Sequence, residues 1–142
     1  MQTFSTDHIL HTLEQELPFL FQKDLTYEIY SPGIIFQDPI NRFQGQQAYR
    51  LIFWALRFHR RLFFTHLTFN VHHIRPSDAN ILVATWTLEG SLRLPWHPKI
   101  HFTGSSTYTI HQGLITTHTD IWDTKPQVIL AQLFKPALKQ EK

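Results

Sequence analysis

The sequence predicts an α+β fold in which N-terminal helices pack on one face of an antiparallel sheet. Apolar residues recur at helical spacing over about residues 7–22 and 45–61. After residue 61 the period changes to two, and short turns separate the alternating segments, which is typical of an antiparallel meander. A chain of 142 residues buries roughly 70% of its unfolded surface, so we expect a single domain, residues 1–142, with a core over about 7–123.

The composition excludes several classes of protein. No cysteine is present, which excludes disulfide bonds and thiolate zinc sites. The start does not resemble a signal peptide and no apolar run approaches the ~20 residues of a membrane span, so we expect a soluble protein that binds no membrane. A net charge of +2 is too small to predict nucleic-acid binding. The 12 Phe, 4 Trp, 4 Tyr and 10 His indicate a large aromatic core or cavity with imidazoles around it.

The first predicted helix covers about Asp7–Gln22, behind three possible capping residues. Pro18 divides it, because proline suits the first turn of a second helix better than the middle of one. A turn at Ser31–Gly33 and a short apolar strand at Ile34–Phe36 follow. Asp38 ends this strand and is expected to cap a turn, with a catalytic role at the mouth of a cavity as the alternative.

A second helical pattern begins at Gly45 and runs into a strand near residue 62. Its apolar face carries Ala48, Leu51, Ile52, Ala55, Phe58 and His59. The opposite face carries Gln47, Arg50, Trp54, Arg57 and Arg61. His59 is expected to enter a cavity or to be an ordinary core histidine. Arg50, Trp54 and Arg57 are expected to face outward, where Trp54 can stack under a guanidinium and the three can bind a partner.

Four strands are predicted over about residues 62–74, 80–94, 99–111 and 114–123. Alternation places large apolar side chains on the face that meets the helices, including Leu67, Phe69, Leu82, Ala84, Trp86, Phe102, Tyr108 and Ile110. Threonine and histidine dominate the other face, as in His72, Thr87 and Thr103, and this face is expected to meet water or a partner subunit.

The last strand admits two registers. If Thr117 and Thr119 join the threonine-rich face, then His118 and Asp120 point into the apolar interior. The opposite register sends Ile115 and Ile121 inward instead. We favour the first register because it continues the threonine-rich face of the neighbouring strands.

A helix is predicted over about residues 126–139 at the end of the chain. Its apolar stripe contains Ile129, Leu130, Leu133 and Phe134, next to Lys135 and Lys139. We expect this helix to pack on the domain, and a helix on a membrane surface or a partner is the alternative.

His118 and Asp120 form the most promising chemical constellation. Residues two apart on a strand project from one face about 7 Å apart, so both can contact one ligand, usually without touching each other. A carboxylate in an apolar cavity can act as a general base while an imidazole delivers the proton elsewhere. The alternative is a structural His–Asp network that links strand and helix.

The other candidate residues are assigned to ligand binding. We expect the pocket to be lined by Tyr30, Asp38, His59, Trp86, Phe102, Tyr108 and Trp122. No metal site is predicted, because pairs such as His8 and His11 imply no third ligand by spacing. A phosphate-binding glycine loop and a nucleophile elbow are both missing, and no cofactor is expected.

The order of the elements resembles the nuclear transport factor 2-like (NTF2-like) fold, a curved sheet wrapped around helices to form a cone. "YSPGIIFQDPINRFQG" is similar to the opening segment of that superfamily, and "FTGSSTYTI" with "GLITTHTDIWD" is similar to its closing strands. In addition, "LPFLFQKDLTYEIY", "DPINRFQG", "YRLIFWALRFHRRLFF" and "LPW" resemble an uncharacterised family of cyanobacteria and plant plastids within this superfamily. This second resemblance covers about residues 8–123.

The resemblance implies a range of functions rather than one. The superfamily includes ketosteroid isomerase, scytalone dehydratase, limonene epoxide hydrolase and polyketide cyclases, together with binding and assembly modules. His118 and Asp120 fall in the strand where polyketide cyclases carry a catalytic histidine or aspartate. A homodimer is also implied. We expect a cyanobacterial cytoplasm, because a plastid precursor would carry an additional N-terminal transit segment.

Three functional hypotheses follow. The first is a domain that binds a small, apolar or aromatic ligand. The second is an isomerase, dehydratase or cyclase in which Asp120 is the base and His118 the acid or orienter, with Tyr108 or His59 polarising a carbonyl. The third is an assembly protein that holds a partner on its outer sheet face or on the stripe of Arg50, Trp54 and Arg57.

Overall fold

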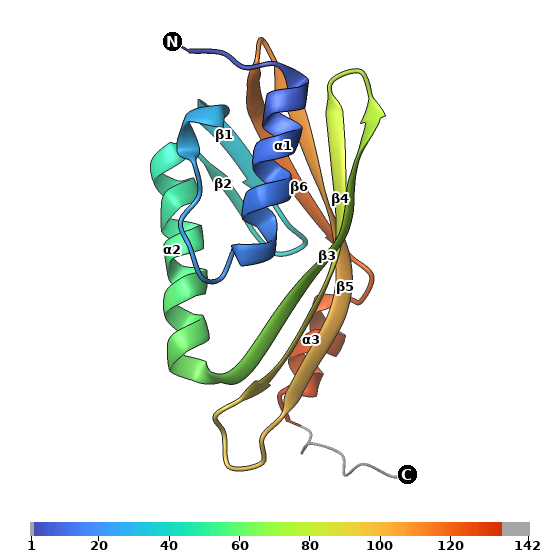
Figure 1. Ribbon diagram of the computed structural model, residues 1–142. Helices are drawn as coiled ribbons and strands as arrows, with labels where there is room; N and C mark the ends of the chain where they lie inside the picture. Colours follow the sequence, from blue (N-terminus) through green and yellow to red (C-terminus); the bar gives the residue numbers. More distant parts are fainter. Residues whose placement is uncertain (1, 135–142) are drawn as a thin grey trace.

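The computed structural model describes residues 2–134 and confirms the α+β fold (Figure 1). A six-stranded sheet has the order β2-β1-β6-β5-β4-β3, in which β1 and β6 are parallel and the other neighbours antiparallel. Figure 1 shows α1 and α2 on the same side of the long, curved strands. The elements are α1 (Thr6–Glu16), η1 (Leu17–Phe19), η2 (Tyr27–Ile29), β1 (Tyr30–Gln37), β2 (Arg42–Gln44), α2 (Gln46–Phe63), β3 (Phe64–Asp78), β4 (Ile81–Leu92), β5 (Lys99–His111), β6 (Leu114–Trp122) and α3 (Pro126–Gln132).

The division of the first helix at Pro18 is confirmed. Ser5 caps α1 by accepting a hydrogen bond from the His8 amide at 3.1 Å. The α-helix ends at Glu16, and Pro18 lies at the start of the short helix η1. Proline is tolerated there because the first amides of a helix have no intrahelical partner. The buried Ile9 and Leu13 attach α1 to the core.

Strand β1 is longer than expected and includes the residues predicted as a turn. It pairs with β6 in a register that shifts between Tyr30 and Ile35, so Ser31–Gly33 form an irregular part of the strand. Asp38 caps the following turn as predicted, because its Oδ1 accepts hydrogen bonds from the amides of Ile40 (2.9 Å) and Asn41 (2.7 Å). The three-residue strand β2 was not predicted.

Helix α2 presents a different face to the core from the one its pattern predicts. Tyr49 and Phe53 are buried, whereas Leu51 is 62% exposed, Phe58 is 46% exposed and His59 is exposed. The prediction failed because apolar residues cover well over half of the circumference of this helix, so the pattern does not determine which part of that arc is buried. The assignment of His59 to the pocket is therefore wrong.

The long strands confirm the predicted faces of the sheet. Leu82, Ala84 and Trp86 on β4 are buried, as are Tyr108 and Ile110 on β5. On β6 the favoured register is also confirmed, because His118 is 3% exposed and Ile121 is 60% exposed. A register shift between Thr109 and Ile110 of β5 lies opposite the start of β6, where Leu114 and Ile115 are both buried.

Helix α3 packs against β5, as Figure 1 shows. The Gln132 side chain accepts a hydrogen bond from the His101 amide (2.9 Å) and donates one to its carbonyl (3.1 Å). The Trp96 indole donates to the Leu133 carbonyl at 2.7 Å. Residues 135–139 of the predicted helix lie outside the described residues. Within residues 2–134, no helix has the length and apolar character required to cross a membrane.

Candidate functional site

A cavity of about 240 Å³ lies between η1, α2 and the inner face of the sheet. Most of its wall is apolar and includes Leu20, Ile52, Phe53, Phe69, Phe102 and Trp122. Its polar groups come from β5 and β6, namely Ser106, Tyr108, His118 and Asp120. Asp38 and Asn41, from the turn between β1 and β2, also line it. We call this space the central cavity.

Three side chains from two elements form a continuous hydrogen-bonded chain beside this cavity. The Tyr49 hydroxyl lies 2.7 Å from Nδ1 of His118. Nε2 of the same imidazole lies 2.7 Å from Oδ1 of Asp120. The sequence predicted that the His118 and Asp120 side chains would usually not touch, but the imidazole and carboxylate are in direct contact.

Two further residues hold the Asp120 carboxylate in place. The Ser106 hydroxyl donates to Asp120 Oδ1 at 2.5 Å, and the Trp86 indole N–H donates to Ser106 Oγ at 2.9 Å. Asp120 Oδ1 therefore accepts two hydrogen bonds. Oδ2 makes no hydrogen bond to any described residue, while the side chain is 17% exposed and lines the cavity. The geometry leaves Oδ2 as the oxygen that a bound molecule can reach.

The protonation pattern of this chain follows from Tyr49. Burial raises the pKa of its hydroxyl well above the ordinary value, and the neighbouring Tyr30 and Tyr108 raise it further. Tyr49 therefore remains a neutral phenol, and we assign it as the donor to Nδ1 of His118. With this assignment the imidazole carries a proton on Nε2 and donates to Asp120 Oδ1, so every hydrogen bond in the chain has one donor and one acceptor.

Aromatic rings enclose His118. The Tyr108 ring lies 4.4 Å from the imidazole centroid, and the Phe36 ring meets it edge-on at 4.9 Å. Phe53 stacks at a larger distance of 6.4 Å. With both ring nitrogens occupied and apolar rings around it, His118 has no nitrogen left for a ligand. Its geometry suits an orienter of Asp120, rather than an acid that acts on substrate.

The structure brings most of the predicted site together. Asp38, Trp86, Phe102, Tyr108, His118, Asp120 and Trp122 line the central cavity. Tyr30 does not, because it is buried behind Tyr49 with its ring centroid 4.8 Å away. His59 stacks on Phe63 at the far end of α2.

Sequence reasoning missed Tyr49 and Ser106. Alternation along β5 places Ser106 on the same face as Phe102 and Tyr108, so this small polar residue among apolar ones was a usable signal. Tyr49 is four residues before Phe53, and this spacing offered a second apolar face for α2. Nothing in the local sequence showed that its hydroxyl reaches His118.

The arginine face of α2 is partly engaged within the molecule. The Arg50 guanidinium lies over the Tyr27 ring at 4.4 Å, and Arg57 Nη1 lies 3.3 Å from Asp24 Oδ1. Trp54 stacks on Phe58 rather than on an arginine, with centroids 5.3 Å apart. Arg57 is mostly buried, which corrects the prediction that it faces outward.

Tyr27 of η2, whose ring lies under Arg50, is also hydrogen-bonded. The Tyr27 hydroxyl donates to Asp24 Oδ1 at 2.5 Å. Burial and this bond raise the pKa of Tyr27 to about 12. For Asp24, partial burial opposes ionisation, but the bonds from Tyr27 and the Leu25 amide, together with Arg57, leave the pKa of the carboxyl below its ordinary value.

The protein has an NTF2-like fold. An NTF2-like protein of unknown function from Cytophaga hutchinsonii superposes with a TM-score of 0.65 at 8% identity, covering 83% of this chain and 99% of the other. A candidate SnoaL-like polyketide cyclase from Jannaschia sp. CCS1 has a TM-score of 0.69 at 15% identity, with coverages of 96% and 100%. A candidate isomerase from Bacillus subtilis has a TM-score of 0.58 at 19% identity, with coverages of 87% and 91%. At these identities the likeness shows the fold alone.

The sequence also defines the family. Residues 7–118 match the family model described as "Uncharacterized conserved protein (DUF2358)". The match covers well over half of the chain, so the protein belongs to this family. A comparison with curated proteins finds no match.

Proposed function

We propose that the protein binds one small, mostly apolar or aromatic molecule in the central cavity and holds the polar end of that molecule against Asp120. The observation that carries the proposal is the distribution of polarity in the cavity. Apolar side chains form most of the wall, and a carboxylate fixed by two hydrogen bonds lies on one side. Small-molecule sites typically combine an apolar wall with a few placed polar groups in this way.

The size of the cavity limits the ligand. About 240 Å³ is less than the roughly 300–1,000 Å³ of sites for drug-sized molecules, whereas a cavity of about 150 Å³ already accommodates benzene. A molecule of one or two rings therefore fits. Because the free oxygen of Asp120 can only accept, the polar end of the ligand should be a donor such as a hydroxyl group.

Binding of naphthol, naphthalene and naphthoate tests this proposal. Trp86 and Trp122 line the cavity, so quenching of their fluorescence reports occupancy. We expect naphthol to bind about 10-fold more tightly than naphthalene, because a hydrogen bond to a charged acceptor is worth about 1.5–3 kcal/mol. Naphthoate should bind weakest, because its carboxylate faces that of Asp120.

Two variants of α2 provide the matched control. Leu56→Trp fills the cavity and should abolish naphthol binding, whereas Leu51→Trp changes the exposed side of the same helix and should leave it intact. Equal binding of naphthol to both variants would contradict the proposal. So would failure of naphthol to bind the unchanged protein.

A second candidate function is proton transfer at a carbon next to a carbonyl group. The observation in its favour is that Asp120 lines the cavity and its Oδ2 makes no hydrogen bond to a described residue, while His118 and Ser106 hold Oδ1. In this step Oδ2 takes a proton from the carbon and the C–H electrons form an enolate. The carboxyl exchanges this proton with solvent water and then protonates the same carbon. Tyr108 also lines the cavity, and burial raises the pKa of its phenol, so it is the neutral donor available to the enolate oxygen.

Exchange of deuterium into β-tetralone, a two-ring ketone, tests this second function. We expect the protein to accelerate exchange in heavy water, and Asp120→Asn to slow the catalysed rate by about 10²-fold or more. Asparagine keeps the shape and accepts both hydrogen bonds at Oδ1, so β-tetralone should still bind. Identical exchange with both proteins would exclude Asp120 as a base and leave a binding protein.

The proposal includes a cytoplasmic homodimer that associates through the outer face of the sheet. On this face His72 Nε2 lies 2.7 Å from Thr87 Oγ1, which in turn lies 3.0 Å from Thr103 Oγ1. Such an ordered polar surface supports an isologous contact. Light scattering after gel filtration measures the mass, and a monomer at micromolar concentration would contradict this part of the proposal.

A further inference from the structure

Helix α2 carries a stripe of large apolar side chains on its outer surface. Trp54, Phe58 and Leu62 are each about half exposed, and their spacing of four residues places them on one face. The rings of Trp54 and Phe58 are nearly parallel, at 12°. Contiguous exposed apolar surface of this kind marks binding sites more often than it occurs by chance.

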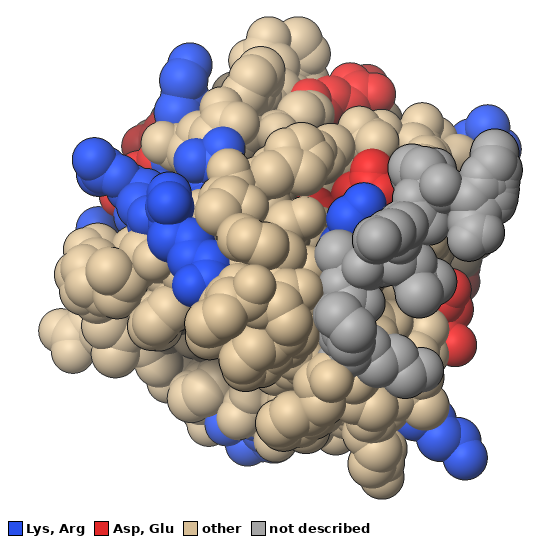
Figure 2. All heavy atoms as spheres, turned by 90° about the horizontal axis from the view of Figure 1, so that it is seen from below, with Lys and Arg blue, Asp and Glu red and all other residues tan. Residues whose placement is uncertain are grey.

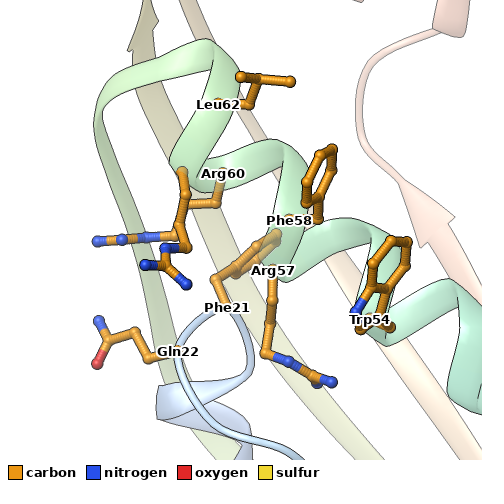
Figure 3. A pocket seen from close by; sticks show the side chains of 8 residues that line it. Phe21, Gln22, Trp54, Arg57, Phe58, Arg60 and Leu62 are labelled. Atoms are coloured by element: carbon orange, nitrogen blue, oxygen red, sulfur yellow. The ribbon is translucent and has the colours of Figure 1, made fainter.

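This stripe forms one side of a groove of about 540 Å³ (Figure 3). We call it the α2 groove, and it is lined by Trp54, Phe58, Leu62, Arg57, Arg60, Arg61, Phe21 and Gln22. Figure 3 shows the apolar side chains on one side of the helix, Arg60 on the other, and Phe21 crossing between them. A smaller hollow of about 210 Å³ shares Phe21, Gln22 and Arg60 and reaches Leu67 on β3. The groove and the hollow share these three lining residues, so they adjoin and form one concave trough.

The charge of the α2 groove has one sign. No acidic residue lines it, and Arg60 and Arg61 form no ion pair with any described residue. Figure 2 shows basic side chains gathered on the left of the molecule seen from below, the side on which α2 ends in Figure 1. Arginines in the last turn of a helix are favoured by its dipole. That effect does not account for the aromatic stripe beside them.

We propose that the α2 groove binds an acidic, amphipathic segment of a partner protein. Carboxylates of the segment pair with Arg60 and Arg61, while its apolar side chains cover Trp54, Phe58 and Leu62. Exposed aromatic residues and arginine are the residue types that contribute most to protein interfaces. An amphipathic helix lying in an apolar groove is a common mode of peptide recognition.

Shape and charge favour this occupant over three others. A lipid surface is flat on this scale and cannot follow a concave trough. Residues 135–142 of the same chain contain three lysines and one glutamate, so they do not complement arginines. A second copy that docked groove to groove in an isologous contact would place arginines opposite arginines, so the homodimer proposed above uses the sheet face instead.

Selection from a library of displayed random peptides of about 12 residues, long enough to span the helical stripe, tests the proposal. The double variant Arg60→Glu, Arg61→Glu is used for counter-selection. A matched control, Arg75→Glu with Arg93→Glu, reverses the charge of two exposed arginines outside the groove. Circular dichroism verifies that both variants fold, and fluorescence polarisation of the enriched peptides gives Kd.

We expect enriched peptides to combine several acidic residues with aromatic or aliphatic ones. Their Kd should weaken about 10-fold or more in the groove double variant and in Trp54→Ala, and change by about 2-fold or less in the control. The proposal is overturned if no peptide is enriched, if the peptides are not acidic, or if they bind the double variant equally.

Two other outcomes would also overturn it by identifying a different occupant. The first uses vesicles of phosphatidylcholine with roughly one third phosphatidylglycerol. A lipid surface is the occupant if the unchanged protein binds these vesicles, the groove variants lose that binding, and no acidic peptide is found. A dimer that only the groove variants dissociate would identify a second copy of the chain.

Discussion

His118 is buried with both ring nitrogens hydrogen-bonded, and this arrangement determines what the site can do. A buried imidazole without partners would be unfavourable, and Tyr49 and Asp120 prevent that at opposite ends of the ring. The histidine thereby orients the carboxylate and links β6 to α2. The same two hydrogen bonds therefore hold the ring in place and, in the function proposed above, orient Asp120.

Two buried tyrosines provide a test at this scale. Tyr49→Phe removes the donor to His118 Nδ1 and should lower the free energy of unfolding by about 1–3 kcal/mol, because a buried acceptor is left without a partner. Tyr30→Phe is the control, since the equally buried Tyr30 hydroxyl makes no hydrogen bond to a described residue. Its unfolding free energy should be unchanged or slightly higher. Urea unfolding measures both, and equal losses would show that the Tyr49–His118 bond contributes nothing specific.

At the scale of elements, the orientation of α2 decides which residues reach the cavity and which face solvent. The buried face of the helix carries Tyr49 and Phe53, and the outer face carries the aromatic stripe. One helix thus supplies a wall to the central cavity and a wall to the α2 groove.

Truncating one aromatic residue on each face tests this orientation. Phe53 is 3% exposed and contacts His118, so Phe53→Ala should destabilise the protein by about 3–5 kcal/mol. Phe58→Ala should cost less than about 1 kcal/mol, because the side chain is already half solvated. Thermal unfolding compares the two variants. A larger loss from Phe58→Ala would support the helix face that the sequence pattern predicted.

Gly104 on β5 provides a test of packing within the sheet. A Cβ atom at Gly104 would lie 2.6 Å from the Trp86 ring and 2.7 Å from the Ile121 carbonyl oxygen. Gly104→Ala should therefore displace Trp86, lower the unfolding free energy by about 1–3 kcal/mol and weaken naphthol binding. Gly33→Ala in β1 meets no atom within 4 Å and should be tolerated. Unaltered tryptophan fluorescence in Gly104→Ala would contradict the contact.

At the scale of the whole molecule, all four tyrosines of the chain are held neutral by the fold. Burial is the largest cause at each of them, and it raises the pKa of Tyr27 to about 12 and those of Tyr30, Tyr49 and Tyr108 further. Three of these rings pack against one another where β1 meets α2. The aromatic core is therefore sensitive to alkaline pH.

This arrangement predicts the response of the molecule to alkaline pH. The pKa of each tyrosine in the folded protein lies above the unfolded value of 10.0. The stability that the neutral phenols contribute is therefore fully present below pH 10 and is lost as the pH rises through about 12. Tyrosinate absorbance should appear together with loss of the circular dichroism signal, in one transition. Ionisation of any tyrosine near pH 10 in a protein that is still folded would contradict the buried core.

The sequence by itself determined the features that depend on local pattern. Period-two alternation in β3–β6 specified which side chains face inward, and the threonines of β6 favoured the register that places His118 and Asp120 inside. Pro18 divided the first helix, and Asp38 capped its turn, because both residues act on their own backbone. Segments of the sequence also resembled those of NTF2-like proteins, and the structure confirmed the NTF2-like fold.

Only the tertiary structure decided the features that join distant residues. Tyr49 and His118 are 69 residues apart and Ser106 and Asp120 are 14 apart, so neither bond leaves a local signal. The rotation of α2 was equally undetermined, because the apolar arc of this helix is wider than the surface it buries, and packing against neighbouring elements decides which part is covered. The parallel pairing of β1 with β6 brings Phe36 beside His118. No turn connects these two strands directly, so no local sequence signal indicates their pairing.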